Sequence, residues 1–203
     1  MNSRAISFVL ACAALGLALP AQSFSFPLNS KASYLRTSSD SPAAPLVLDL
    51  AGLGLAPGMW LRIGTSGGFR YVSGGQDDFH SLIGVFSASA TLLATNVQQR
   101  VPDAIAAGPA FPSPNTYFGN QPMDVPQDFY CSRNTYEESA VVQIPDGATH
   151  LFLGVHDSYY ADNGDPNGDY QALVSVVPTP PLPGTGEHLE LRGAVNATPT
   201  FSP

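Results

Sequence analysis

The sequence predicts an all-β protein built as a single antiparallel β-sandwich. Charged residues make up only 12% of the 203 residues, about half the roughly 25% of an average globular chain. Long solvated helices need Glu, Lys and Arg on their outer faces, so this composition disfavours them. Glycine and proline contribute 19 residues each, and they separate short apolar stretches in the manner of turns between strands.

The expected strands are short, and turns that contain Gly or Pro bound them. Two long connections interrupt them: a Gly-rich surface loop over residues 64–79 and a proline-rich excursion over residues 101–131. A loop as long as the second is usually functional or disordered. A further short strand over residues 189–191 is expected at a sheet edge. The main expected strands span residues 46–50, 60–64, 82–86, 91–94, 140–144, 150–155 and 170–177.

Four segments divide the chain. Residues 1–23 have the form of a bacterial signal peptide, with one arginine, an apolar run of about 15 residues and small residues before the cleavage point. That run is shorter than the ~20 residues of a bilayer span, although an N-terminal anchor helix is the alternative. We therefore expect a secreted, extracellular or cell-surface protein without stable membrane insertion. A Ser/Pro-rich leader over residues 24–44, a sandwich domain over 45–177 and a Pro-rich linker and tail over 178–203 follow.

Charge and cysteine content exclude several classes of protein. Sixteen acidic against eight basic residues give a net charge of −8, which disfavours a nucleic-acid partner because phosphate binding needs a basic surface. The sequence has a single lysine, Lys31. Cys12 lies in the expected signal peptide, so Cys131 remains alone and no internal disulfide is expected. The domain must then be held by its core, by a metal ion or by self-association into a homo-oligomer.

The loop over residues 156–170 concentrates acidic and amide side chains. A hard divalent cation explains such a loop, because Ca²⁺ binds about six to eight oxygens from carboxylates, amides and carbonyls. The spacing of Asn163, Asp165 and Asn167 matches the first half of an EF-hand loop, but Val174 stands where that loop requires Glu. We therefore expect a calcium loop on a β scaffold, with an exposed turn without metal as the alternative. The loop contains Asp157, Asp162, Asn163, Asp165, Asn167 and Asp169.

The order of features around this loop resembles the calcium-dependent galactophilic lectin family of bacteria. A strand is followed by Asp157, then by the vicinal pair Asp162 and Asn163, a glycine and the last strand. An Ile-Pro-x-Gly-Ala turn at 144–148 precedes the penultimate strand, in the order of that family. Three departures are that Asp162 replaces the family's first Asn, that the gap after Asp157 is shorter by two residues, and that residues 164–167 look like an insertion. The resemblance implies a jelly-roll or galactose-binding-like sandwich with a calcium ion that bridges two sugar hydroxyls.

The resemblance also implies which residues bind. Asp157 would contact both calcium and a galactose-like or other glycan. The vicinal pair would supply two further side-chain ligands, and backbone carbonyls of two neighbouring loops would complete the shell. Asp165, in the insertion, would either join the shell or block the approach of the sugar. The calcium ligands expected in this way are Asp157, Tyr160, Asp162, Asn163, Asp165 and Tyr71. The expected sugar contacts are Asp157, Asn163, Tyr159 and His80.

Catalysis is not expected from this sequence. It contains no nucleophile elbow and no metalloprotease motif. His156 beside Asp157 is interpreted as a packed histidine at a strand end, and the adjacent Asp77 and Asp78 would point apart on a strand. Two hypotheses remain. The first is a secreted calcium-dependent carbohydrate-binding module, and the second is a secreted or cell-surface structural or adhesion protein in which calcium only stabilises the loop.

Overall fold

A computed structural model describes most of the chain between residues 22 and 178. Nearly all of the expected signal peptide, and of the expected linker and tail, lies outside the described residues. Within the described part, no helix is long and apolar enough to cross a membrane. The described residues are 22–37, 40–107, 117–118, 121–122, 125–133, 138–178 and 189–191.

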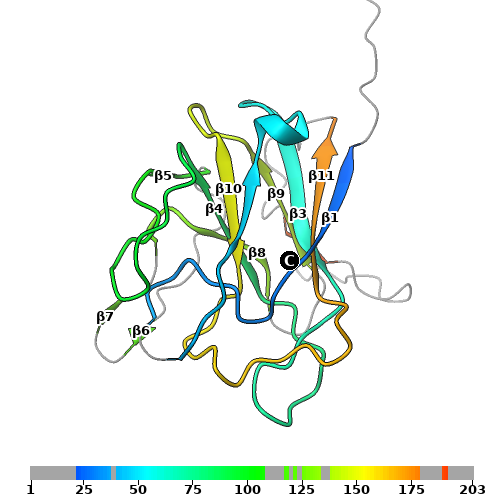
Figure 1. Cartoon of the computed structure of the whole chain (residues 1–203). Coiled ribbons are helices and arrows are strands. Elements are labelled where there is room, and N and C mark those ends of the chain that lie inside the picture. Colours follow the sequence, from blue (N-terminus) through cyan, green and yellow to red (C-terminus); the bar gives the residue numbers. More distant parts are fainter. Residues whose placement is uncertain are drawn as a thin grey trace, which may run out of the picture.

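Two antiparallel sheets form the body of the molecule, in a sandwich-like arrangement (Figure 1). This confirms the expected all-β class. The first sheet contains, in spatial order, β1 (Ser23–Pro27), β11 (Gln171–Val177), β3 (Trp60–Ser66), β9 (Glu138–Gln143) and β12 (Leu189–Leu191). The second contains β2 (Leu46–Asp49), β10 (His150–Gly154), β4 (Leu82–Ser87) and β5 (Ala104–Ile105), with β8 (Phe129–Ser132) also paired to β4. The remaining elements are η1 (Ala51–Leu53) and the small hairpin of β6 (Tyr117–Phe118) and β7 (Gln121–Pro122).

One expected strand is wrong. Residues 91–94 form no strand; they belong to a loop between β4 and β5. The Thr91 amide donates a hydrogen bond to the Ser89 hydroxyl oxygen, and the Leu93 amide donates one to the Arg100 carbonyl. Leu93 is 36% exposed, so the apolar run that predicted a strand is divided between core and solvent. The backbone here forms hydrogen bonds with side chains and within turns, and these take the place of hydrogen bonds to a neighbouring strand.

The core lies between the two sheets. Along β3 and β11, inward residues alternate with outward ones; Leu61 and Ile63 are fully buried, and so are Ala172 and Val174. This period of two is typical of a sheet with one solvated face. β4 differs, because all six of its residues are buried. The second sheet is therefore covered on its outer face at β4 and β10, while β2 at its edge keeps exposed residues.

The segment after β1 supplies part of that cover. The Val155 amide, just beyond β10, donates to the carbonyl of Ala32 (2.8 Å), and Gly154 lies so close to this carbonyl that a Cβ there would approach it to 3.1 Å. Tyr34 and Leu35 are fully buried. In the expected leader over residues 24–44, β1 is an edge strand paired to β11, and Leu28 and Ala32 belong to the core together with Tyr34 and Leu35. Their scattered apolar side chains bury surface without the periodicity that would have identified them.

Candidate functional site

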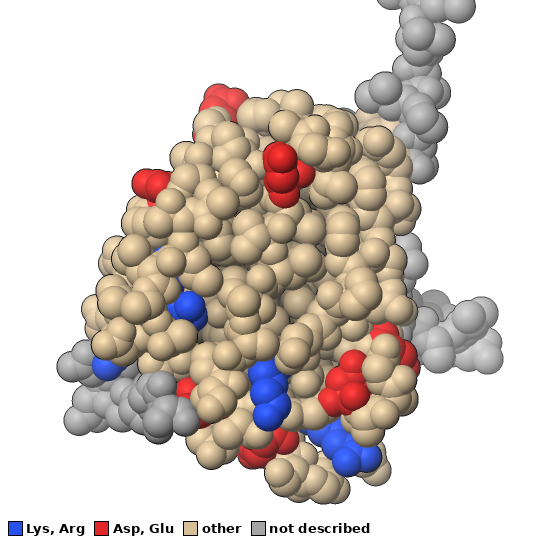
Figure 2. All heavy atoms as spheres, in the orientation of Figure 1, with Lys and Arg blue, Asp and Glu red and all other residues tan. Residues whose placement is uncertain are grey.

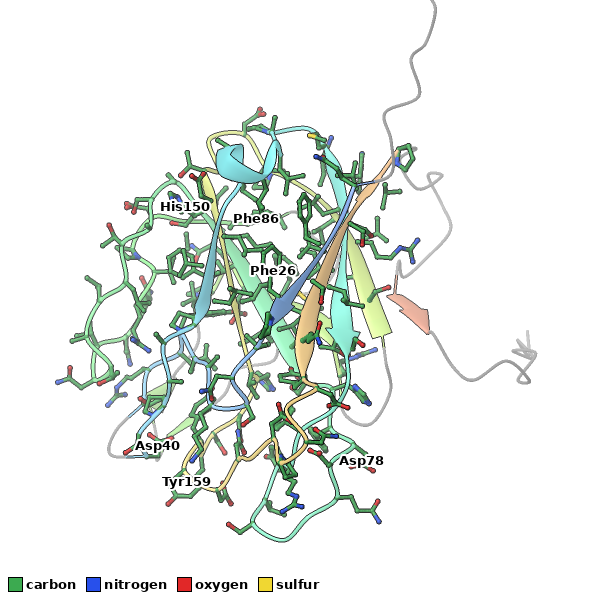
Figure 3. The ribbon with its side chains drawn as sticks, turned by 45° about the vertical axis from the view of Figure 1, so that its right-hand side comes forward. Phe26, Asp40, Asp78, Phe86, His150 and Tyr159 are labelled. Atoms are coloured by element: carbon green, nitrogen blue, oxygen red, sulfur yellow. The ribbon has the colours of Figure 1, made fainter. Side chains whose placement is uncertain are left out.

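Two loops meet at one end of the sandwich. β3 and β11 are antiparallel, with Ser66 opposite Gln171. The chain that leaves β3 and the chain that enters β11 are therefore neighbours. These are the 67–80 loop and the 156–170 loop, which both lie at the lower end in Figure 1. In Figure 3, Tyr159 and Asp78 lie at this end, while His150 lies at the opposite end.

Backbone hydrogen bonds join the two loops. The Arg70 amide donates to the Gly164 carbonyl (2.6 Å), and the Gly164 amide donates back to the Arg70 carbonyl (3.0 Å). The Gly68 amide donates to the Asp169 carboxylate (3.2 Å). Gly67 has a left-handed φ of +69°, and a Cβ placed on it would lie 2.2 Å from the carbonyl oxygen of Asp169. Each loop therefore fixes the conformation of the other.

Further contacts hold the 156–170 loop from the core side. The Lys31 ammonium donates to the Ala161 carbonyl at 2.7 Å. The Asn163 side-chain amide donates to the Ser30 carbonyl at 3.0 Å. The Tyr160 backbone amide donates to a carboxylate oxygen of Asp40 at 2.9 Å. A segment more than a hundred residues away in the sequence thus supports the loop.

Asp157 is the second residue of the 156–170 loop and is only 4% exposed. Its Oδ1 accepts the backbone amides of Ser158 (2.6 Å) and Tyr159 (3.1 Å). Its Oδ2 is buried and makes no hydrogen bond of standard geometry, while the Tyr71 hydroxyl and the Asn163 side chain lie near enough to the carboxylate to interact with it as donors. Burial raises the pKa of Asp157; the Tyr159 amide, the Asn163 side chain and the Ser158 amide oppose this to a smaller extent.

Asn163 presents a second unpaired oxygen. Its side chain is 4% exposed, and the bond from Nδ2 to the Ser30 carbonyl fixes which end of the amide is the oxygen. Oδ1 is buried without a donor. A buried acceptor without a partner costs roughly 1–3 kcal/mol, and native structures rarely leave one unexplained. These two oxygens belong to one loop and to side chains that interact with each other, and carboxylate and amide oxygens are both ligand types that calcium binds.

Tyr71 and Asp162 complete the surroundings of this oxygen pair. Partial burial raises the pKa of the Tyr71 hydroxyl, and so do the charge of Asp157, a hydrogen bond to Asp157 and the charge of Asp162. Tyr71 therefore lies beside the 156–170 loop. Among the described residues, no group of three or more His, Cys, Asp or Glu side chains is arranged to hold a metal ion. A cation at this place would therefore need amide and carbonyl oxygens beside the carboxylates.

The other expected ligands have different surroundings. The side chain of Tyr160 is fully buried, and its hydroxyl donates to the Val155 carbonyl (3.0 Å); its carbonyl accepts the Asn163 amide (3.3 Å). Asp165 caps its own turn, because its two carboxylate oxygens accept the amides of Gly168 (2.9 Å) and Tyr170 (3.3 Å). The charge of Asp165 acts on Asp77, whose pKa is raised by burial first and then by Asp165 and Asp169. The structure thus groups Asp165 with a second set of carboxylates.

A pocket of about 260 Å³ adjoins the oxygen pair. Tyr71 lines the pocket and also lies beside Asp157, and its ring stacks on the Phe79 ring with centroids 4.6 Å apart. On another wall, the Tyr130 hydroxyl lies 3.3 Å from Nδ1 of His156, and the Arg133 guanidinium lies 5.8 Å from the centre of the Tyr130 ring. The pocket is lined by Tyr71, Phe79, Ser81, Tyr130, Arg133 and His156.

Two of the expected sugar contacts, His80 and Tyr159, lie outside the pocket lining. His80 is not one of the lining residues, although both of its neighbours, Phe79 and Ser81, are. Tyr159 is 52% exposed in the 156–170 loop (Figure 3). Sequence reasoning missed Tyr130 and Arg133, which β8 and the residue after it bring to the pocket. Their only sequence signal is an aromatic and a cationic side chain at the end of the proline-rich excursion.

Tyr170 anchors the end of the loop, and its removal should be measurable. Its hydroxyl donates to the Ser81 carbonyl at 2.8 Å, in the core. We expect Tyr170→Phe to lower the free energy of unfolding by about 1 kcal/mol, because it leaves a buried acceptor unpaired. Tyr159→Phe, on an exposed side chain, should change it by less than about 0.5 kcal/mol. Urea denaturation measures both, and equal midpoints for the two variants would contradict the prediction.

Comparisons of the chain with protein-family models, with curated proteins and with solved structures find no match. The likeness to the galactophilic lectins therefore rests on the motif between Asp157 and Asn163 and on the order of the surrounding strands. The geometry of the two loops is the remaining guide to function.

Proposed function

We propose that this chain is a secreted, non-enzymatic, calcium-dependent carbohydrate-binding module. In this proposal a calcium ion bound in the 156–170 loop bridges hydroxyls of a sugar. The observation that carries it is the pair of buried, unpaired oxygens, Asp157 Oδ2 and Asn163 Oδ1. The proposal extends to the fold, for which the two antiparallel sheets support a jelly-roll or galactose-binding-like sandwich.

The residues around the oxygen pair are a suitable donor set for calcium. Asp157 and Asn163 offer one carboxylate and one amide oxygen, and the nearby Asp162 offers a second carboxylate. Backbone carbonyls of Tyr71 and Tyr160 are candidates for further ligands. Calcium accepts about six to eight oxygens, so coordination positions remain for two neighbouring hydroxyls of a sugar. A bound calcium ion would hold the sugar hydroxyls, which are weak ligands that water would otherwise displace.

The pocket beside the oxygen pair supports a sugar rather than a purely structural ion. Its volume of about 260 Å³ is below the roughly 300–1,000 Å³ of sites for larger ligands, as a single sugar ring requires. The Tyr71 ring, which is 37% exposed and backed by Phe79, offers an apolar face to the C–H face of a pyranose. The Ser81 and Tyr130 side chains offer polar atoms in the same wall.

The second candidate is a secreted or cell-surface structural or adhesion protein in which calcium only stabilises the loop. The observation that favours it is that the loop already joins three parts of the chain, through the bonds of Arg70 with Gly164 and of Lys31 with Ala161. An ion there would tighten the junction without any ligand.

A glycan array separates the two candidates. We expect the chain without its expected signal peptide, residues 1–23, to bind at least one class of glycan in calcium, and the signals to fall to background in chelator. Asp157→Asn should abolish this binding, while Asp146→Asn, in an exposed turn at the other end of β10, should retain it. Calcium-dependent stabilisation without binding to any glycan would refute the lectin proposal in favour of the structural one.

A further inference from the structure

Arg133 gives the pocket a positive charge that a neutral sugar does not require. Of the six lining residues, it is the one whose side chain is always cationic. We propose that the preferred ligand is an acidic sugar, a pyranose that carries a carboxylate, with its carboxylate bound by Arg133. This inference rests on the proposed function, because the sugar hydroxyls would still be held at the Asp157 end.

The pocket connects these two ends. Tyr71 lines it and lies beside Asp157 and Asp162. Arg133 lines it as well, and its guanidinium lies 5.8 Å from the centre of the Tyr130 ring. Of the expected calcium ligands, Tyr71 lines the pocket itself, so a ligand that fills the pocket meets Tyr71, the neighbour of Asp157, and the Arg133 guanidinium. A ring with vicinal hydroxyls and a carboxylate has complementary groups for both.

The surrounding charge makes the position of Arg133 informative. The chain has a net charge of −8, and Figure 2 shows acidic and basic side chains gathered at the lower end, where the loops lie. An anionic ligand approaching Asp157 and Asp162 is repelled unless cations compensate. In this proposal, calcium offsets the repulsion by Asp157 and Asp162 at one end of the pocket, and Arg133 attracts the ligand's carboxylate at the other end.

Arginine is the residue best suited to this task. Its planar guanidinium matches a carboxylate through two parallel N–H···O bonds, and charge-assisted bonds of this kind are roughly twice as strong as neutral ones. Its position over the Tyr130 ring, 5.8 Å from the centroid, is a favourable cation–π arrangement. Five donors allow a carboxylate to bind while other contacts are kept.

Matched sugar pairs test the inference. The probes are galacturonate with galactose, glucuronate with glucose and mannuronate with mannose, each titrated calorimetrically in calcium at constant ionic strength. We expect at least one acid to bind about tenfold more tightly than its neutral partner. Arg133→Gln should reduce this ratio to about one. Arg133→Lys should keep an intermediate ratio, and Arg62→Gln, on β3 and outside the pocket lining, should keep the full ratio.

The outcomes are distinguishable. Equal calcium-dependent affinity for acid and neutral partners overturns the inference about Arg133 and leaves the carbohydrate-binding proposal intact. An acid preference that survives in Arg133→Gln also overturns it, because the carboxylate is then bound by calcium alone. Absence of calcium-dependent binding to any sugar overturns the proposed function itself. The melting temperature of each variant in calcium identifies a misfolded one, and the ratio is then taken from Arg133→Lys.

Discussion

Gly67→Ala is expected to lower the free energy of unfolding by about 2–5 kcal/mol. Two costs add. A φ of +69° is strained for a residue with a Cβ by about 1–2 kcal/mol, and the new Cβ would lie 2.2 Å from the Asp169 carbonyl oxygen. The loops must then separate, at a further cost of about 1–3 kcal/mol, as for other overpacked sites. Because the Gly68 amide and the Asp169 carboxylate meet beside this contact, the site should be distorted as well.

Gly74→Ala is the matched control for this change. It lies in the same loop with a φ of +75°, but a Cβ there has no atom within 4 Å. It carries the backbone strain alone, partly offset by the lower entropy of the unfolded chain, so we expect a loss of about 1 kcal/mol. Urea denaturation of both variants measures the difference. Equal losses would mean that the contact between the two loops does not form in solution.

Calcium is expected to raise the melting temperature by roughly 5–10 °C. A ligand that binds only the folded state stabilises it by about 2.7 kcal/mol at a concentration 100-fold above its Kd. For a domain of this size, 1 kcal/mol corresponds to about 2–4 °C. Differential scanning fluorimetry in calcium and in chelator measures the shift. An unchanged melting curve would contradict the calcium site.

Asp157→Asn tests whether calcium binds at Asp157 through two measurements, the calcium-dependent shift of the melting temperature and the stability in chelator. The variant should lose the calcium-dependent shift, because it lacks the carboxylate charge. In chelator it should be at least as stable as the wild type, since it removes a buried charge that has one unpaired oxygen. A carboxylate with a purely structural role would give the opposite sign in chelator. Asp146→Asn, which is exposed, should keep the full calcium shift.

Local patterns in the sequence predicted much of the fold. Alternating polar and apolar residues at 60–64 identified β3, and the apolar run at 82–86 identified β4 as a buried strand. The same kind of run misled at 91–94, where hydrogen bonds to Ser89 and Arg100 hold a loop. Period and propensity describe which surface is buried, but they do not say whether a neighbouring strand is available to pair.

The candidate site was predictable only where it is local in sequence. Asp157, Asp162 and Asn163 lie within one loop, so their spacing alone groups them as candidate ligands. Asp40 and Arg133 reach the loop and the pocket from distant segments, and no pattern along the chain relates them to Asp157. Asp165 shows the converse: it is close in sequence, yet its oxygens are used by the amides of its own turn.

The contact of Lys31 with the Ala161 carbonyl has a practical consequence for every binding assay. The chain has one lysine, so amine-directed dyes, biotin esters and sensor-chip coupling can react only there or at the N-terminal amine. A product at Lys31 removes the ammonium that holds the 156–170 loop, and loss of binding in such a sample would report the label rather than the ligand. Attachment through an engineered terminal tag avoids this.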